Sequence, residues 1–203
     1  MKHIPKMDNI WAIILAAGAS TRMKTQKLLL PWNRKTIVET VVEKALEAVH
    51  SNVVVVLGSH HEKIFRQINN PSLKYTINHN FMDGMLSSVI CGFRALPENA
   101  DVAFLCLGDQ PQLSPQIFQQ VAKAWKESKK GIVIPTYQGK RGHPVLIETR
   151  YKSEIEKLDT EKGLRILSQK FAEDVFEVEC GFAEILRDID TPDDYKKELI
   201  NNQ

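Results

Sequence analysis

The sequence has few cysteines, little net charge and no long apolar run. Its three cysteines, Cys91, Cys106 and Cys180, are widely spaced and form no CxxC pair, which argues against a disulfide framework and a structural zinc site. A formal net charge of +2 argues against a general nucleic-acid binder, which needs a basic stripe or a high pI. The apolar stretch 10–17 has eight residues, whereas a bilayer span needs about 20, and the N-terminus lacks the layout of a secretory signal. We therefore expect a cytoplasmic protein that binds neither nucleic acid nor membrane.

What the sequence does have is a regular alternation of strand-like and helix-like segments. With 203 residues, of which 43% are hydrophobic, the chain suits one domain over residues 1–203 with a sizeable core. Apolar runs predict strands over residues 10–17, 52–58, 73–78, 101–109, 131–137, 143–148, 175–179 and 184–189. Helical spacing and capping signals, such as Thr36 with Glu39, predict helices over residues 36–50, 60–68, 84–96, 114–125, 161–171 and 191–200.

This order of elements predicts the fold class and the place of the site. Alternating strands and helices indicate an α/β fold with three α/β/α layers, built on a Rossmann-like, mostly parallel sheet. The less regular last third predicts a mixed edge. Ligands of such sheets bind beyond the carboxyl ends of the strands, so the segments that follow the strands are the candidates for function.

Positive charge gathers in the loop after the first expected strand. Between Ser20 and Val38 there are five cations and no acid: Arg22, Lys24, Lys27, Arg34 and Lys35. The small residues Ala16, Ala17 and Gly18 let a ligand approach the backbone, whose N–H groups can bind an anion. With Arg22 and Lys27 this loop suits a triphosphate, although an ordinary turn with solvated charges is an equal alternative. Neither GxxxxGK[ST] nor GxGxxG is present, which argues against those two nucleotide folds.

Carboxylates follow two later segments. Asp109 comes directly after a buried strand and suits Mg²⁺, which is bound through oxygen atoms and substrate phosphates. Its alternative role is that of a turn residue. Asp188 and Asp190 end a later segment, and Asp190 would supply the second metal carboxylate unless it only starts the following helix.

Two further stretches are weaker candidates. Gly84, Ser87 and Ser88 could surround a base or sugar, with helix capping as the alternative. Gly142 and His143 lie in a flexible basic loop that suits a second, phosphate-bearing substrate. A lone histidine before a proline is more often structural than a general base, and we favour that interpretation.

Taken together, the motifs "LAAGASTRMKTQKLLLPW", "GMLSSV", "LGDQP", "RGHPVL" and "DIDTPDDY" resemble one family. They are similar to the molybdenum cofactor nucleotidyltransferases, the MobA/MocA-like branch of the nucleotide-diphospho-sugar transferase-like fold. The resemblance spans roughly residues 10–195. It implies an enzyme that binds a nucleoside triphosphate with Mg²⁺ and transfers the nucleotidyl group to the phosphate of the molybdopterin cofactor, releasing pyrophosphate.

The resemblance also implies roles for particular residues. Leu15, Ala16, Ala17 and Gly18 would approach the nucleotide. Arg22, Lys27 and Asp109 would be catalytic, the two cations holding the phosphates, and Asp109 and Asp190 would hold the metal. The motif "LAAG" followed by "KLLLPW" resembles the cytidylyl branch, which makes CTP the expected nucleotide and a hydroxylase of the xanthine dehydrogenase type the expected recipient of the product.

One residue departs from the family pattern, and it keeps alternatives open. Lys24 stands where the family usually has glycine. If the backbone must be left-handed at this position, lysine would strain it by about 1 kcal/mol or more. The acceptor could instead be a sugar or polyol phosphate. The protein could also be a non-catalytic carrier of the molybdenum cofactor, which would leave Asp109 and Asp190 without a task. A monomer is the default expectation.

Overall fold

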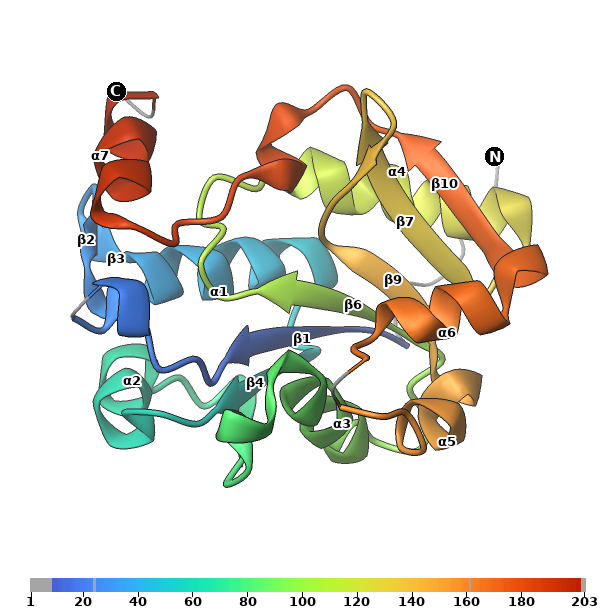
Figure 1. Ribbon diagram of the computed structural model, residues 1–203, viewed down its shortest axis with the longest axis horizontal. Coiled ribbons are helices and arrows are strands. Elements are labelled where there is room, and N and C mark those ends of the chain that lie inside the picture. The colour runs from blue at the N-terminus through green and yellow to red at the C-terminus, as the bar shows by residue number, and fades with distance from the viewer. Residues whose placement is uncertain (1–8, 24, 161, 202–203) are drawn as a thin grey trace.

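A computed structural model describes residues 9–23, 25–160 and 162–201 of the chain. Its centre is a mixed sheet with the strand order β10-β7-β9-β6-β1-β4-β5, with β8 paired to β7 (Figure 1). The strands are β1 (Ile10–Ala16), β4 (Val53–Leu57), β5 (Leu73–Ile77), β6 (Val102–Leu107), β7 (Ile132–Tyr137), β8 (Lys140–Arg141), β9 (Val145–Glu148) and β10 (Val175–Glu179). A small hairpin, β2 (Pro31–Trp32) with β3 (Lys35–Thr36), lies apart from this sheet.

The predicted mixed edge is confirmed. β6, β1, β4 and β5 run parallel to one another, and β10 is parallel to β7. β9 lies between these two groups and is antiparallel to both β6 and β7. The loop before β9 therefore reaches the same edge of the sheet as the loops that follow β1 and β6.

Helices cover both faces of the sheet, as the three-layer prediction requires (Figure 1). The helices are α1 (Ile37–Val49), α2 (His61–Ile68), α3 (Met85–Ala95), α4 (Pro115–Ser128), α5 (Lys152–Ile155), α6 (Arg165–Lys170) and α7 (Pro192–Asn201). One buried cluster packs α1, α2 and α4 against Ile10, Ala12 and Ile14. The other packs α3, α5 and α6 against the alternate residues Trp11 and Ile13. Side chains that alternate between two buried faces explain why β1 is apolar throughout.

Capping signals in the sequence set the start of α1. The hydroxyl of Thr36 accepts a bond from the N–H of Glu39, and the Glu39 carboxylate accepts one of 2.7 Å from the N–H of Thr36. This is the predicted capping box, which satisfies N–H groups that the first helical turn leaves free.

Two predicted elements differ from the structure. Residues 184–189, expected to be a strand, instead form a 3₁₀ helix over Ala183–Leu186, because the carbonyl of Ile185 accepts its bonds from Gln110 and His143 rather than from a neighbouring strand. The helix expected over 161–171 begins only at Arg165, because Gly163 takes a positive φ of 71° that no α-helix accommodates. Its expected first residue, Glu161, lies outside the described residues. Within the described ranges, every helix is too short or too polar to cross a bilayer.

Candidate active site

The carboxyl ends of β1 and β6 lie side by side, because Leu15 pairs with Leu107 in the parallel ladder. A cavity of about 320 Å³ opens beyond these ends, and we call it the strand-end pocket. Residues that the sequence singled out line much of it: Leu15, Ala17, Gly18, Lys27, Gly84, Ser88, Asp109 and Asp190. Segments far apart in the sequence thus meet at the edge of the sheet where the sequence predicts a ligand.

Three other predicted residues have different positions. Ala16 is fully buried and faces the α1 cluster rather than the pocket. The hydroxyl of Ser87 donates to the carbonyls of Asn80 and Gly84, at 2.9 and 2.8 Å, and Gly84, the N-cap of α3, has no side-chain cap bond. Arg22 lies outside the lining of the pocket but reaches Asp190. Lys24, the departure from the family pattern, falls outside the described residues.

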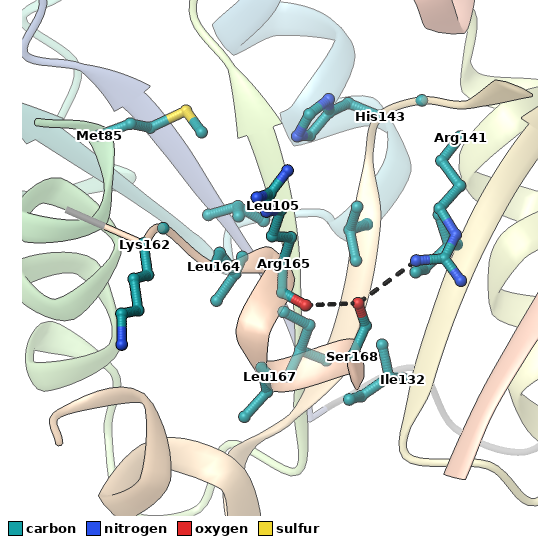
Figure 2. Close-up of a pocket in the computed structure, with 15 residues that line it drawn as sticks. Met85, Leu105, Ile132, Arg141, His143, Lys162, Leu164, Arg165, Leu167 and Ser168 are labelled. Carbon is teal, nitrogen blue, oxygen red and sulfur yellow. Dashed lines mark hydrogen bonds between the residues drawn. The ribbon is translucent and has the colours of Figure 1, made fainter. Parts of the chain in front are cut away.

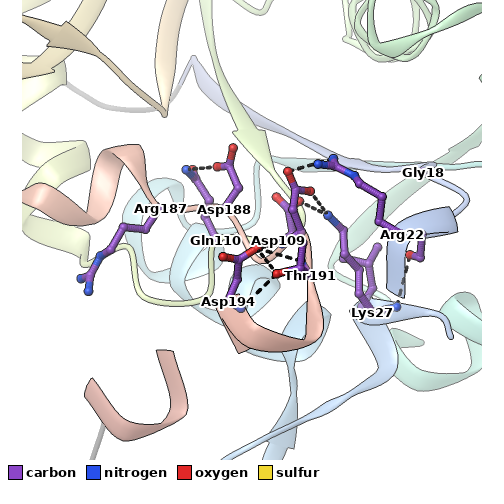
Figure 3. A network of polar contacts seen from close by, with 12 residues as sticks. Gly18, Arg22, Lys27, Asp109, Gln110, Arg187, Asp188, Thr191 and Asp194 are labelled. Carbon is purple, nitrogen blue, oxygen red and sulfur yellow. Dashed lines mark hydrogen bonds and ion pairs between the residues drawn. The ribbon is translucent and has the colours of Figure 1, made fainter. Parts of the chain in front are cut away.

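Two cations of the basic loop point at the carboxylates (Figure 3). The Nζ of Lys27 contacts Oδ2 of Asp109 and lies 2.9 Å from Oδ1 of Asp190. The guanidinium of Arg22 lies 2.8 Å from Oδ2 of Asp190. The side chains of Lys27 and Asp109 are only 14% and 15% exposed, so solvent screens their attraction weakly. Loop cations and strand-end carboxylates therefore form one ion-pair cluster, whose formal charges sum to zero.

Charge sets the protonation of this cluster. Burial lowers the pKa of Lys27, but the charges of Asp109 and Asp190 and their hydrogen bonds outweigh it, so the pKa lies above its usual value of 10.5. Lys27 is therefore a permanent cation at neutral pH. Burial and the neighbouring charge of Asp109 raise the pKa of Asp188 to about 6, which marks a third carboxylate in the same pocket.

Gln110 connects the two acidic segments. It is only 1% exposed, and its Nε2 donates to Oδ1 of Asp188 at 2.8 Å and to the carbonyl of Ile185 at 3.3 Å. The N–H of Ile189 donates to the carbonyl of Asp109. These bonds bring residues 185–190 alongside the end of β6, although about eighty residues separate the two segments in the sequence.

The start of α7 fixes the other side of Asp190. Thr191 and Asp194 form reciprocal bonds: the Thr191 hydroxyl accepts from the N–H of Asp194, and the Asp194 carboxylate accepts from the N–H of Thr191 at 2.8 Å. Arg187 lies 3.3 Å from Glu198, a carboxylate of α7 that is 4% exposed. The acidic segment is therefore held by the helix that follows it.

The basic loop has a polar scaffold of its own. The hydroxyl of Ser20 donates to Oε1 of Gln26 at 2.7 Å and accepts a bond from the N–H of Lys27 at 3.2 Å. Ser20 has a left-handed φ of 53°, whereas Gly18 is not among the glycines with positive φ. Gly18 instead leaves open space, because an added Cβ would meet no atom within 4 Å.

A second cavity of about 330 Å³ adjoins the first, with Met85 lining both, and we call it the apolar pocket (Figure 2). Buried side chains of the sheet and of α6 form its walls: Leu105, Ile132, Ile134, Ile147 and Leu167. Three cations lie around it: Arg141, Lys162 and Arg165. Among the residues that the structure describes, its lining contains no Asp or Glu. Such a cavity suits a largely apolar ligand that carries negative charge.

The predicted residues Gly142 and His143 line the apolar pocket. An added Cβ on Gly142 would collide with the carbonyl of Ile185, so close packing against the acidic segment requires glycine there. Burial lowers the pKa of His143, against the opposing influence of the Asp109 charge, which favours a neutral ring at neutral pH. The structure thus places His143 within electrostatic reach of the ion-pair cluster.

The carboxylates of the cluster fit a divalent cation. Asp109 and Asp190 already converge on one positive centre, the ammonium of Lys27, and both offer only oxygen ligands. Within the described ranges there is no group of three or more His, Cys, Asp or Glu residues arranged to hold a metal. A site with few protein ligands is typical of Mg²⁺, which keeps waters and binds substrate phosphates.

Sequence reasoning missed several residues of the two pockets. Phe81 and Met85 line the strand-end pocket, and Arg165 lines the apolar pocket. Gln110 and Gln26 support the site through hydrogen bonds. For Gln110 and Gln26 a signal was available, because each directly adjoins a predicted charged residue. Arg165 gave no comparable signal, because its position depends on the packing of α6.

Comparison with known proteins bears on the family and the fold. The MobA-like NTP transferase domain matches residues 12–175. The molybdenum cofactor cytidylyltransferase of Escherichia coli K12 is 33% identical over 93% of this chain and 95% of its own length. The nicotine blue oxidoreductase of Paenarthrobacter nicotinovorans is 26% identical over 90% and 92%. In structure, Rv0371c of Mycobacterium tuberculosis H37Rv has a TM-score of 0.85 at 24% identity, covering 95% of this chain and 97% of its own.

These matches confirm the predicted fold and family. The structural match extends over nearly the whole of both chains, which confirms the nucleotide-diphospho-sugar transferase-like architecture. The family domain covers the strand-end pocket up to Asp109 and the apolar pocket, and the E. coli relative is similar over almost the full length. The chain therefore belongs to the MobA-like NTP transferase family.

Proposed function

We propose that this protein is a Mg²⁺-dependent cytidylyltransferase that transfers CMP from CTP to the phosphate of the molybdopterin cofactor and releases pyrophosphate. The observation that carries the proposal is the ion-pair cluster of Arg22, Lys27, Asp109 and Asp190 at the carboxyl ends of β1 and β6. The similarity to the E. coli cytidylyltransferase supports both CTP and the acceptor. A hydroxylase of the xanthine dehydrogenase type would receive the product, and the reaction would take place in the cytoplasm.

The residues of the cluster divide the chemistry between them. An oxygen of the acceptor phosphate attacks the α-phosphorus of CTP, and the bond from that phosphorus to the bridging oxygen breaks, so pyrophosphate leaves with the electron pair. Lys27 and Arg22 neutralise the triphosphate and the departing pyrophosphate. Asp109 and Asp190 would hold Mg²⁺, which supplies positive charge at the phosphate oxygens. The attacking phosphate is already ionised at neutral pH, so no general base is required.

The apolar pocket supplies the acceptor site in this proposal. Its apolar walls suit the faces of the flat pterin ring system, and the cations around it suit the acceptor phosphate. Its position beside the strand-end pocket would let the acceptor phosphate approach the α-phosphorus, and His143 lines the apolar pocket. A carrier would need this pocket but not the ion-pair cluster, so the cluster favours the enzyme.

The experiment is pyrophosphate release by the purified protein with Mg²⁺ and molybdenum cofactor, with CTP, GTP and ATP in separate reactions. Release with CTP alone is expected. Asp109→Asn should lower kcat by about 100-fold or more while the protein stays folded, because it removes charge needed in the transition state. Asp101→Asn, at the opposite end of β6, is the matched control and should retain activity.

Two outcomes would contradict the proposal. Release with GTP or ATP but not with CTP would reject the cytidylyl assignment. No release with any nucleotide, from a folded sample that still binds the cofactor, would reject the enzyme and support the carrier.

A further inference from the structure

Asn78 is a buried amide that directly follows β5 and lies outside the lining of the strand-end pocket. It is 6% exposed, and its backbone N–H donates to the carbonyl of Leu57 at 2.7 Å. Its side-chain Nδ2 donates to the hydroxyls of Ser87 and Ser88, at 2.8 and 3.0 Å. Its Oδ1 accepts a bond of 2.9 Å from the N–H of Asn80. One side chain thus joins the end of β5 to the start of α3.

The segment that Asn78 holds forms a wall of the strand-end pocket but has little burial of its own. Phe81 and Gly84 of this segment line the pocket. None of the residues 81–83 is buried, and Met82 is 77% exposed. A segment with few buried apolar contacts is held weakly by packing. The position of this wall therefore depends on the hydrogen bonds of Asn78.

The orientation of the Asn78 amide follows from its neighbours. The backbone N–H of Asn80 can only donate, so the amide must turn its oxygen toward it. The NH₂ group then faces the two serine hydroxyls, to which it can only donate. The polarity of both contacts is therefore fixed, and the serine oxygen is the acceptor in each.

The two hydroxyls differ in where their own protons go. Ser87 donates to the carbonyls of Asn80 and Gly84 and lines a separate cavity of about 520 Å³. Ser88 is 5% exposed and lines the strand-end pocket, and no atom of the described residues accepts its proton. A buried donor without a partner is costly, so the proton of Ser88 favours a ligand atom that accepts it.

We propose that Asn78 is a positioning residue that makes Ser88 a hydrogen-bond donor toward the nucleotide in the strand-end pocket. Cytosine offers both kinds of group: a carbonyl oxygen and a ring nitrogen that accept, and an amino group that donates. The polarity of Ser88 selects an accepting atom rather than the amino group. This role rests on the proposed function, because it takes the ligand of the pocket to be CTP. Asn78 itself acts on affinity only through Ser88.

The test is calorimetric binding of CTP with Mg²⁺ present and no acceptor, so no turnover is needed. Asn78→Asp replaces the NH₂ group by an oxygen of similar size that can only accept. Ser88 must then turn its proton toward the new carboxylate, and the Kd for CTP should rise by about tenfold, the effect of one lost hydrogen bond. Asn80→Asp is the matched control, because it adds the same charge on an exposed side chain outside the pocket lining. Its Kd should equal that of the unaltered protein.

A double-mutant cycle separates this role from a general effect on the fold. Ser88→Ala should itself raise the Kd by about tenfold. Adding Asn78→Asp to it should raise the Kd little further, because the hydroxyl through which Asn78 acts is gone. Ser87→Ala also removes a bond to Asn78 but outside the pocket lining, so it should have a smaller effect than Ser88→Ala.

Asn78→Ser provides a second variant in case Asn78→Asp fails to fold. Its side chain is uncharged and too short to reach both hydroxyls, so it should raise the Kd in the same direction, again only while Ser88 is present. An Asn78 variant that binds CTP as tightly as the Asn80→Asp control would overturn the proposal. So would equal losses of affinity with and without Ser88, which would show that Asn78 acts on the fold alone. Absence of CTP binding by the unaltered protein would instead reject the proposed function, and this role with it.

Discussion

At the scale of single residues, two glycines shape the edge of the sheet where β1 and β6 end. Gly108 follows β6, and an added Cβ there would lie 2.7 Å from the carbonyl oxygen of Leu15. At Gly18, which follows β1, an added Cβ would instead lie in open space. The same residue type thus serves packing at one position and access at the other.

These two glycines give a matched pair of variants. Gly108→Ala should lower the free energy of unfolding by about 1–3 kcal/mol, because backbone must move to make room for the methyl group. Gly18→Ala should change it by less than about 0.5 kcal/mol, but should raise the KM for CTP because the methyl group narrows the strand-end pocket. Urea unfolding and initial rates measure the two effects. Equal stability loss in both variants would contradict the packing argument.

Single residues also show how far sequence reasoning reached. The roles of Asp109, Lys27 and Gly18 remain predictions, but the sequence brought them to one pocket because residues at strand ends share an edge of the sheet. It did not predict that Lys27 contacts the carboxylates themselves. That contact depends on how the loop folds back, and neither spacing nor residue type encodes this direction.

At the scale of elements, α7 fixes the position of the second carboxylate. Glu198 of α7 pairs with Arg187, and Asp194 accepts bonds at the helix start next to Asp190. Since residues 185–190 form no strand of the sheet, these side-chain contacts replace the ladder that holds Asp109 in place.

Glu198→Gln should therefore affect both stability and activity. Loss of the charge leaves Arg187 with Glu184 as its remaining carboxylate partner. We expect the free energy of unfolding to fall by about 1–3 kcal/mol, less than for a fully buried pair because the side chain of Arg187 is 29% exposed. The KM for CTP should rise as Asp190 loses its fixed position. Glu127→Gln, on the surface of α4, is the control. A variant as stable and active as the control would show that α7 has no positioning role.

Elements were easier to predict from the sequence than their irregular connections. The strands β1, β4 and β6 are continuous apolar runs, and α1 carries a capping box, so pattern and structure agree there. The segment 184–189 has a strand-like pattern because Ile185 and Ile189 are buried, but they are buried by packing against the sheet's end rather than within it. Periodicity alone does not distinguish these two environments.

At the scale of the whole molecule, two pockets with different chemistry meet at one residue. Met85 lines both the strand-end pocket and the apolar pocket, and its side chain is half exposed. Figure 2 shows Arg165 pointing across the apolar pocket toward His143, whereas Lys162 points away from it.

Steady-state kinetics with both substrates should separate these pockets. Arg165→Ala should raise the KM for the acceptor by about tenfold, as expected for a lost charge-assisted bond, and leave the KM for CTP unchanged. Lys123→Ala, on the surface of α4, is the control and should change neither value. Met85→Ala should raise both. An effect of Arg165→Ala on CTP alone would place the acceptor elsewhere.

The antiparallel pairing of β9 has a consequence for how the two pockets can change in evolution. Because β9 runs antiparallel to β6, the loop before it brings Gly142 and His143 to the edge where the strand-end pocket lies, and apart from Met85 and Leu105 the lining of the apolar pocket comes from residues 132–168, after Asp109. Substitutions over residues 139–168 can therefore remodel one cavity while the other keeps its charges. If the proposed function holds, a related protein with this sheet could accept a different acceptor while its nucleotide site stays unchanged.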